Sequence, residues 1–175
     1  MVREVYYEYH IDLQNYQIRK DDPDIKLYSS KYRKSFVLCL QKCGNKRLET
    51  ERRIELKRGS KIYLYIPQDR VRGYMVLTAR GKIKDYGMYG KHQVGYMYNG
   101  LLSLLYACLN DASLSMNKVI FKVPVKFDKF NKLLERVWCD IGCKIDVKIK
   151  YLWVPKKVEI LGRTYKTWRW KKLAN

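Results

Sequence analysis

The longest stretch of apolar residues at helical spacing lies between His92 and Asn117. It contains no lysine or arginine, although the chain has 37 of them in 175 residues, and Asp111 is its single acidic residue. Its apolar side chains recur at steps of three and four residues and nearly encircle a helix, which predicts a helix buried on most sides. Asn99 and Asn110 interrupt the run, so it is not expected to span a membrane, which requires about 20 apolar residues.

Alternation of apolar and polar residues predicts strands in the first half of the chain. Val5, Tyr7 and Tyr9 alternate with more polar neighbours, so the chain opens with an amphipathic strand. Gly44 and Asn45 form a two-residue turn of the kind that joins the strands of a hairpin. The expected strands are 5–13, 35–42, 47–57, 62–66 and 71–84, and residues 1–85 are therefore expected to be mainly β.

The second half alternates strands and helices. Phe130, Leu134 and Trp138 lie on one helical face, and Gly142 follows as a residue that ends helices. After it, apolar and polar residues alternate again. The expected elements are strand 119–123, helix 127–141, strand 145–153 and strand 158–172 with a turn or bulge at Gly162.

These elements predict an α+β fold with a mixed, mainly antiparallel sheet, one buried central helix and one amphipathic helix. At 175 residues the chain fits a single domain, 1–175, which buries about 70% of its unfolded surface. Residues 86–175 are expected to form a β-α-β-α-β-β-type half that takes 71–84 as its first strand. Parallel pairing is expected across the helical connections.

The net charge of +20 narrows the classes of partner. Self-repulsion of this size opposes compactness unless an anionic partner compensates for it, and nucleic acid is the commonest such partner. An acidic protein, a membrane surface and an anionic cofactor are other candidates, and a solvated, thermophile-like surface is the alternative without a partner. The first residues, MVREVYY, contain no secretion signal, so an intracellular, cytoplasmic protein is expected.

Basic and aromatic residues are interleaved from Lys144 to the end of the chain. Cations neutralise phosphates while aromatic faces stack on bases. We therefore expect a binding protein, without catalytic residues, that engages RNA or DNA or a nucleoprotein complex. The alternative is that the tryptophans belong to the core and the lysines to its solvated side. The predicted nucleic-acid-binding residues are Lys148, Lys150, Lys156, Lys157, Arg163, Lys166, Trp168, Arg169, Trp170 and Lys171.

Two groups of residues have the chemistry of metal ligands. Glu8, His10 and Asp12 share one strand face, from which a nuclease would hold Mg²⁺ together with another acid such as Asp69 or Asp85. The five cysteines are an odd number, which argues against a disulfide framework. A four-thiolate zinc site would use Cys39, Cys43, Cys139 and Cys143. Buried free cysteines and a polar strand face explain both groups more simply, so no metal and no other cofactor is expected.

The order of elements and one motif resemble the C-terminal half of the GNAT family of acetyl-CoA-dependent N-acetyltransferases, over roughly residues 72–172. The motif is Asn131-x-x-Leu134-x-x-Val137-Trp138-x-x-x-Gly142-Cys143. The resemblance implies an alternative function, an N-acyltransferase using acetyl-CoA, with a pyrophosphate-binding loop at 86–95 and two closing antiparallel strands. The cofactor-binding residues that it implies are Gly90, Gly95 and Asn131.

The chain departs from the family pattern in two places. Family members carry Gln/Arg-x-x-Gly-x-Gly/Ala before the helix, whereas the glycines of this sequence are Gly90, Gly95 and Gly100, which do not form a clean copy. Trp138 stands where the family often has a tyrosine that protonates the leaving thiolate, and an indole N–H is not a useful acid. The resemblance therefore implies a divergent loop, and a fold reused for binding stays open.

Overall fold

The computed structural model describes residues 2–90, 94–154, 156–160 and 163–167. Its centre is a seven-stranded sheet in the order β2-β3-β4-β5-β6-β1-β7. Neighbouring strands are antiparallel except β5 and β6, which are parallel. The strands are β1 (Val2–Asp12), β2 (Ile25–Leu27), β3 (Lys61–Tyr65), β4 (Gly73–Leu77), β5 (Lys82–Met88), β6 (Lys118–Pro124) and β7 (Ile145–Val154). The mixed, mainly antiparallel α+β fold predicted from the sequence is confirmed.

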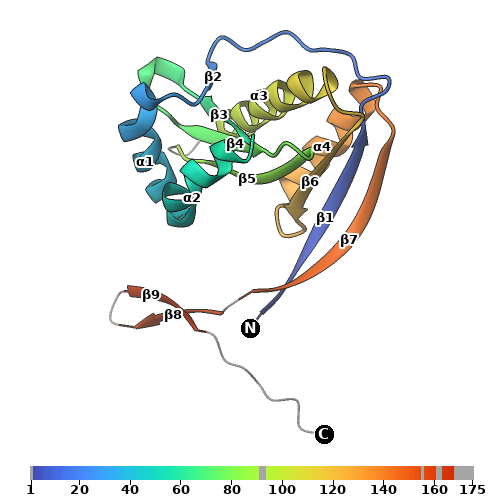
Figure 1. Cartoon of the computed structure of the whole chain (residues 1–175). Helices are drawn as coiled ribbons and strands as arrows, with labels where there is room; N and C mark the ends of the chain where they lie inside the picture. The colour runs from blue at the N-terminus through green and yellow to red at the C-terminus, as the bar shows by residue number, and fades with distance from the viewer. Residues whose placement is uncertain (1, 91–93, 155, 161–162, 168–175) are drawn as a thin grey trace, which may run out of the picture.

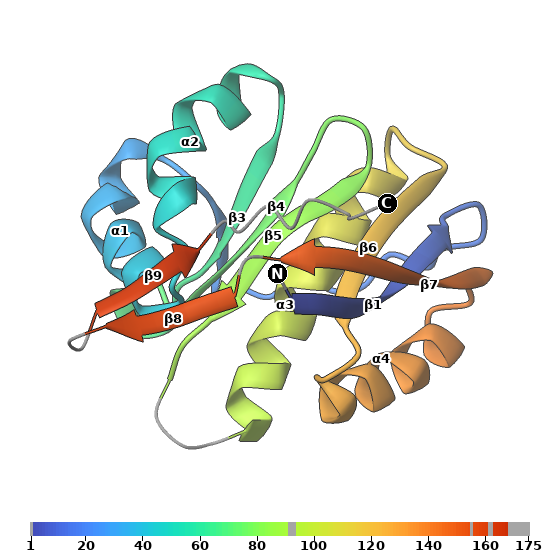
Figure 2. The same cartoon turned by 90° about the horizontal axis from the view of Figure 1, so that it is seen from below.

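Helices cover both faces of the sheet, in two pairs (Figure 1). One pair packs on the first face of β3 and β4, and the other pair covers the opposite face and extends over β6 and β1 (Figure 2). The first pair is α1 (Arg33–Lys42) and α2 (Lys46–Lys57), and the second is α3 (Val94–Ser113) and α4 (Asp128–Asp140). A separate two-stranded sheet, β8 (Lys156–Ile160) with β9 (Arg163–Thr167), follows β7.

The central strands are apolar on both faces because each face has its own core. Leu64 and Val76 pack beneath α1 and α2, while Tyr63 and Met75, their neighbours in sequence, pack against α3. Such two-sided burial explains the nearly continuous apolar runs of β3 and β4. Residues that point to opposite faces therefore belong to different hydrophobic clusters.

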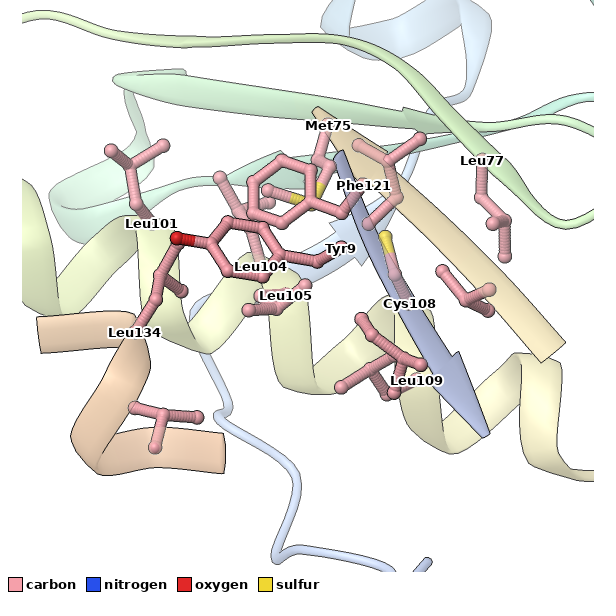
Figure 3. Close-up of a cluster of buried hydrophobic side chains, with 14 of the residues drawn as sticks. Tyr9, Met75, Leu77, Leu101, Leu104, Leu105, Cys108, Leu109, Phe121 and Leu134 are labelled. Atoms are coloured by element: carbon pink, nitrogen blue, oxygen red, sulfur yellow. The ribbon is translucent and has the colours of Figure 1, made fainter. Parts of the chain in front are cut away.

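Helix α3 supplies much of the larger core. Figure 3 shows Leu101, Leu104, Leu105, Cys108 and Leu109 directed toward side chains of the sheet, and each is 8% exposed or less. Of the other described side chains of α3, Asn99 is exposed and the rest are at least half-buried. A Cβ added at Gly100 would lie 2.9 Å from Cε1 of Tyr65, so the absence of a side chain lets the helix approach the sheet. The predicted helix, buried on most sides, is confirmed.

The strand predicted at 35–42 is wrong, because this segment lies in α1. Phe36, Cys39 and Leu40 are fully buried, whereas Leu38 between them is 49% exposed. The spacing i, i+3, i+4 is helical, but a short apolar run does not distinguish a buried strand from one face of a helix.

The strand predicted at 47–57 is also wrong, because α2 occupies it. The turn before it joins two helices rather than two strands. Gly44 has φ of +72°, the left-handed conformation that ends helices, and the side chain of Asn45 accepts a hydrogen bond from the backbone N–H of Leu48 at 3.3 Å. Glycine and asparagine suit a helix end and a helix start as well as they suit a hairpin.

Two segments predicted as single strands each contain parts of two strands in the structure. The segment 71–84 contains β4 and the start of β5, joined by a tight turn at Gly81. The last predicted strand, 158–172, begins as the hairpin of β8 and β9, and Gly162 lies outside the described residues. The elements predicted at 5–13, 62–66, 119–123, 127–141 and 145–153 are confirmed.

The first strand of the chain completes the second half of the sheet. β1 lies between β6 and β7, so that Tyr9 pairs with Phe121 on one side and Val147 on the other. The resemblance implied two closing strands that are adjacent in sequence. In the structure β7 pairs instead with β1, and β8 pairs with β9 in a separate sheet. Parallel pairing across a helix is confirmed for β5 and β6, whereas β1 separates β6 from β7.

Candidate functional site

The parallel strands β5 and β6 meet at one end and diverge at the other. Their register covers Lys82 with Ile120 and Ile83 with Phe121, and within the described residues it does not continue toward Met88 and Pro124. A cleft of about 650 Å³ opens at this fork, lined by residues of β1, β5, β6 and β7, of the β4–β5 turn and of the loop after β6. The lining includes Tyr6, Glu8, Asp85, Lys122, Phe127 and Leu152.

Gly81 fixes the closed end of the fork. Its φ is +73°, and an added Cβ would lie 2.5 Å from the carbonyl oxygen of Lys118. The carbonyl of Gly81 in turn accepts a hydrogen bond of 2.8 Å from the backbone N–H of Ile120. The close approach of the β4–β5 turn to β6 therefore requires glycine here.

A β-bulge places two charged residues of β5 on the same side of the sheet. Val76 pairs with Asp85 and Leu77 with Ile83, so Lys84 is the extra residue. Nζ of Lys84 is 2.6 Å from Oε1 of Glu55 on α2. Asp85 also interacts with charges of α2. Burial raises the pKa of Asp85 above its ordinary value, and the charge of Lys84 offsets part of this rise.

Glu8 lies on the opposite wall of the cleft, and its pKa is shifted in the opposite direction to that of Asp85. It is 8% exposed, with its Oε1 at 2.6 Å from Nε2 of His10 and its Oε2 at 3.2 Å from Nζ of Lys122. Burial alone would raise the pKa of Glu8, but the hydrogen bonds from His10 and Lys122 bring it below its ordinary value. The cleft thus contains one carboxylate held ionised and one that takes up a proton more readily.

Aromatic rings fill the space on the other side of the fork. Tyr86 packs edge-to-face on Phe121, Phe121 on Phe130, and Phe130 stacks on Tyr98 of α3, with ring centroids 5.1, 6.4 and 5.7 Å apart. The hydroxyl of Tyr86 donates a hydrogen bond of 3.3 Å to the carbonyl of Lys122. Burial raises the pKa of Tyr86 far above its ordinary value, so the phenol stays protonated and acts as a donor.

The residues predicted to bind nucleic acid are only partly described. Lys148 and Lys150 are exposed on β7. The register pairs them with Glu8 and Tyr6, which places both on the face of the sheet that carries the cleft. The backbones of Lys156, Lys157, Arg163 and Lys166 belong to β8 and β9. Nothing is described of their side chains, and Trp168, Arg169, Trp170 and Lys171 lie outside the described residues. The nucleic-acid interface stays a prediction.

The residues implied for acetyl-CoA lie at three separate places. Asn131 is 3% exposed; its amide donates to the carbonyls of Pro124 and Phe127 at 3.0 and 3.1 Å and accepts from the hydroxyl of Tyr9 at 2.9 Å. Its side chain therefore fixes the start of α4. Gly90 is exposed just after β5, and the backbone of Gly95 lies in the first turn of α3. Their part in cofactor binding stays a prediction.

The potential metal ligands are not gathered into a site. Glu8, His10 and Asp12 do share one face of β1, yet no group of three metal-ligating side chains occurs among the described residues. Cys39 and Cys43 lie on α1, whereas Cys139 and Cys143 lie at and after the end of α4, and all of them are free thiols. Trp138 is buried against the ring of Tyr9, so it belongs to the core.

Asp85 is the cleft residue whose position sequence reasoning missed. The signal was present in Lys82-Ile83-Lys84-Asp85, where two successive charged residues interrupt the alternation of polar and apolar positions. An interruption of period two inside a strand marks a bulge. The sequence alone does not show which face then buries the carboxylate.

Comparison with known proteins identifies the fold but not the family. No family model and no curated protein matches the chain. A functionally unknown conserved protein from Staphylococcus epidermidis superposes with a TM-score of 0.54 and 14% identity, covering 86% of this chain and 60% of that one. A Drosophila protein superposes with a TM-score of 0.59 and 9% identity, covering 86% and 50%.

A GCN5-related N-acetyltransferase from Sphaerobacter thermophilus also superposes, with a TM-score of 0.54 and 11% identity, covering 85% of this chain and 51% of that one. The GNAT-like fold suspected from the sequence is thus confirmed. The chain spans 50 to 60% of the length of these three structures. Among the described residues, no helix has the length and apolar character needed to cross a membrane.

Proposed function

We propose that the protein is an N-acyltransferase that transfers an acyl group from acetyl-CoA or a related thioester to an amine. The observation that carries the proposal is Asp85, a carboxyl of raised pKa in a cleft at the fork of the two parallel strands. A general base works best when its pKa lies near the working pH. The GNAT-like fold supports this choice over a binding protein without catalysis.

The open fork suits the extended, amide-bearing arm of a thioester donor. Beyond Ile83 and Phe121, the edges of β5 and β6 that face each other are not paired with one another in the described residues. An amide-bearing chain forms hydrogen bonds with such an edge, as an added strand does. When bound, the donor supplies an acyl group activated as a thioester. Gly90 precedes α3 and Gly95 lies in its first turn, where backbone N–H groups suit phosphate oxygens.

Different residues of the cleft accept the proton of the acceptor amine, bind its charge and contact its carbon chain. Asp85 accepts the proton that the amine loses, because its raised pKa makes it the stronger base of the two carboxylates. Glu8 remains ionised between His10 and Lys122 and favours a cationic acceptor. Phe127 and Leu152 line the cleft with apolar surface and exclude water from the acceptor's carbon chain.

Asp85→Asn tests this assignment. Acyl transfer from acetyl-CoA to a panel of small amines and lysine peptides is measured by thiol release. We expect the variant to lose activity by about 10²- to 10⁴-fold, the contribution of a general base. The activity of the natural protein should fall as the pH drops through the raised pKa of Asp85, because the base is then protonated. Asp146→Asn, which changes an exposed acid on β7, is the matched control and should retain activity.

Two results would contradict the proposed function. One is the absence of any acyl transfer across the panel together with no heat of acetyl-CoA binding at millimolar concentration. The other is an Asp85→Asn variant as active as the Asp146→Asn control, which would remove Asp85 from catalysis.

A further inference from the structure

The outer strand of the sheet, β7, is long, exposed and apolar on one face. It has ten residues and pairs with β1, and within the described residues no strand pairs with its outer edge. Figure 1 shows β7 beside β1 at the end of the sheet. Val147, Ile149 and Tyr151 are 48%, 57% and 53% exposed. Proteins normally shorten, charge or cover such an edge, because it offers unpaired backbone groups to other chains.

The backbone groups on the outer edge belong to the same residues as the exposed apolar side chains. Lys144 accepts a hydrogen bond of 2.9 Å from the backbone N–H of Asp12, so the even-numbered residues of this strand face β1. In an antiparallel pair the hydrogen-bonding direction alternates along the strand. The N–H and C=O groups of Val147, Ile149 and Tyr151 therefore point away from β1.

The other face of β7 is cationic. Lys148 and Lys150 are exposed and alternate with the apolar residues. Asp146, near the start of the strand, is the acidic residue of this face. The whole chain carries a net charge of +20. This charge opposes pairing with a second copy and favours an anionic partner.

The chemistry of the apolar face favours a peptide over nucleic acid. Val147 and Ile149 are aliphatic and branched, which suits cross-strand packing with other side chains, whereas stacking of bases requires aromatic faces. The ring of Tyr151 already has the guanidinium of Arg3 over it, at 3.7 Å from its centroid. An open strand edge also favours a peptide, because it forms hydrogen bonds with the successive backbone amides of an extended chain.

We propose that β7 binds an extended acidic segment of another protein, which adds to the sheet as a further antiparallel strand. Apolar residues of the segment lie opposite Val147 and Ile149 and direct their N–H groups toward β7. Its acidic residues lie opposite Lys148 and Lys150 and direct their N–H groups away. Binding at this edge does not require catalysis at the fork, although Leu152 of the same strand lines the cleft.

The experiment uses the full chain and a synthetic peptide of alternating valine and glutamate, with the ten-residue length of β7. Binding is measured by fluorescence anisotropy at about 0.15 M salt. N-methylation of the valines should weaken binding at least about tenfold, because it removes hydrogen bonds to the edge. N-methylation of the glutamates, with equal charge and composition, should leave the affinity within about twofold. Equal affinity of all three peptides would overturn the proposal, since charge alone would then explain binding.

Variants of the protein test the surface itself. The double change Lys148→Glu and Lys150→Glu should weaken peptide binding at least about tenfold. Lys129→Glu with Arg136→Glu, on the exposed face of α4, alters the net charge equally and should change the affinity less than about twofold. Ile149→Lys should also weaken binding, and circular dichroism checks that each variant is folded.

Two other occupants of β7 would overturn the proposal. One is a second copy, seen as concentration-dependent dimerisation in ultracentrifugation that Ile149→Lys abolishes. The other is nucleic acid, seen when labelled single-stranded RNA or DNA displaces the peptide and loses affinity in the Lys148→Glu, Lys150→Glu variant but not in the α4 control.

Discussion

Strands β3 and β4, near one end of the sheet, and β7, at its other end, differ in how completely their apolar residues are buried. In β3 and β4, neighbouring residues such as Tyr63 and Leu64 are buried in separate cores on the two faces. In β7 the apolar residues alternate regularly with lysine, yet Val147 and Ile149 remain about half exposed. Regular alternation identifies a strand but does not establish that its apolar face is covered by the same chain.

The uncovered strand is the one that offers a surface to a partner. A strand covered on both faces has no surface left to offer, and its sequence serves packing. Exposure of an apolar face and an unpaired edge is unfavourable, and covering them by binding lowers the free energy. This makes β7 the part of the described sheet best suited to bind another molecule.

The strongest test of the comparison removes equivalent side chains from both ends. Leu64→Ala should lower the free energy of unfolding by about 2–5 kcal/mol, because it creates a cavity beneath α1 and α2. Ile149→Ala should change it by less than about 0.5 kcal/mol, as for other exposed positions. Urea unfolding of both variants provides the measurement. A comparable loss for Ile149→Ala would show that β7 is covered within the chain.

A second test concerns the junction between the two ends of the sheet. Gly81→Ala should lower the free energy of unfolding by about 1–3 kcal/mol, because its positive φ and the carbonyl of Lys118 both oppose a side chain. Gly44→Ala has a similar φ of +72° with no atom within 4 Å of the added Cβ, so it measures the cost of the conformation alone. Thermal unfolding that gives equal losses would exclude close packing of the turn on β6.

The smallest expected effect is electrostatic and belongs to the covered end. The hydrogen bond from Lys84 holds the pKa of Glu55 below its ordinary value of 4.5. Since this pKa is lower in the folded state, the stabilisation is present above about pH 4.5 and is lost as the pH falls through the folded-state pKa. Glu55→Gln should cost about 1 kcal/mol at pH 7 and reduce the loss of stability between about pH 5 and pH 3.

Glu49→Gln, on the same helix, is the control for this change, because it removes one acid from α2 without touching the ion pair with Lys84. Urea unfolding across the pH range compares the two variants. Identical pH profiles for Glu55→Gln and the natural protein would contradict the role assigned to the Lys84–Glu55 pair.

Sequence patterns predicted the elements whose periodicity is long and unambiguous. The apolar face of α4 and the alternation of β7 were sufficient to identify both, as were the steps of three and four residues in α3. Residues 35–42 were misassigned because five successive apolar residues fit a buried strand and a helix face equally. Residues 47–57 carry few apolar side chains, so apolar periodicity says little about them. The local signals for a helix are its helix-forming residues, the Asn45 cap and the Arg47–Glu51 pair.

The candidate site was less predictable than the fold because it depends on contacts between distant segments. The raised pKa of Asp85 arises from burial beside α2, and the ionised state of Glu8 depends on Lys122, which the pairing of β1 with β6 brings beside it. Neither contact has a local signature. The motif around Asn131 did identify the fold, although its side chain proved to fix the start of α4.

The position of β1 has a consequence for the order in which the molecule is assembled. Asp12 pairs with Lys118, and the next strand along, β7, begins at Ile145. At a synthesis rate of about 5–20 residues per second, β1 leaves the ribosome ~5–20 s before its first partner. β1 is thus paired only after a long stretch of later residues has been made, and closing so long a loop slows folding. Until then, the apolar face and both edges of β1 lack their partners, and such surfaces promote aggregation during folding.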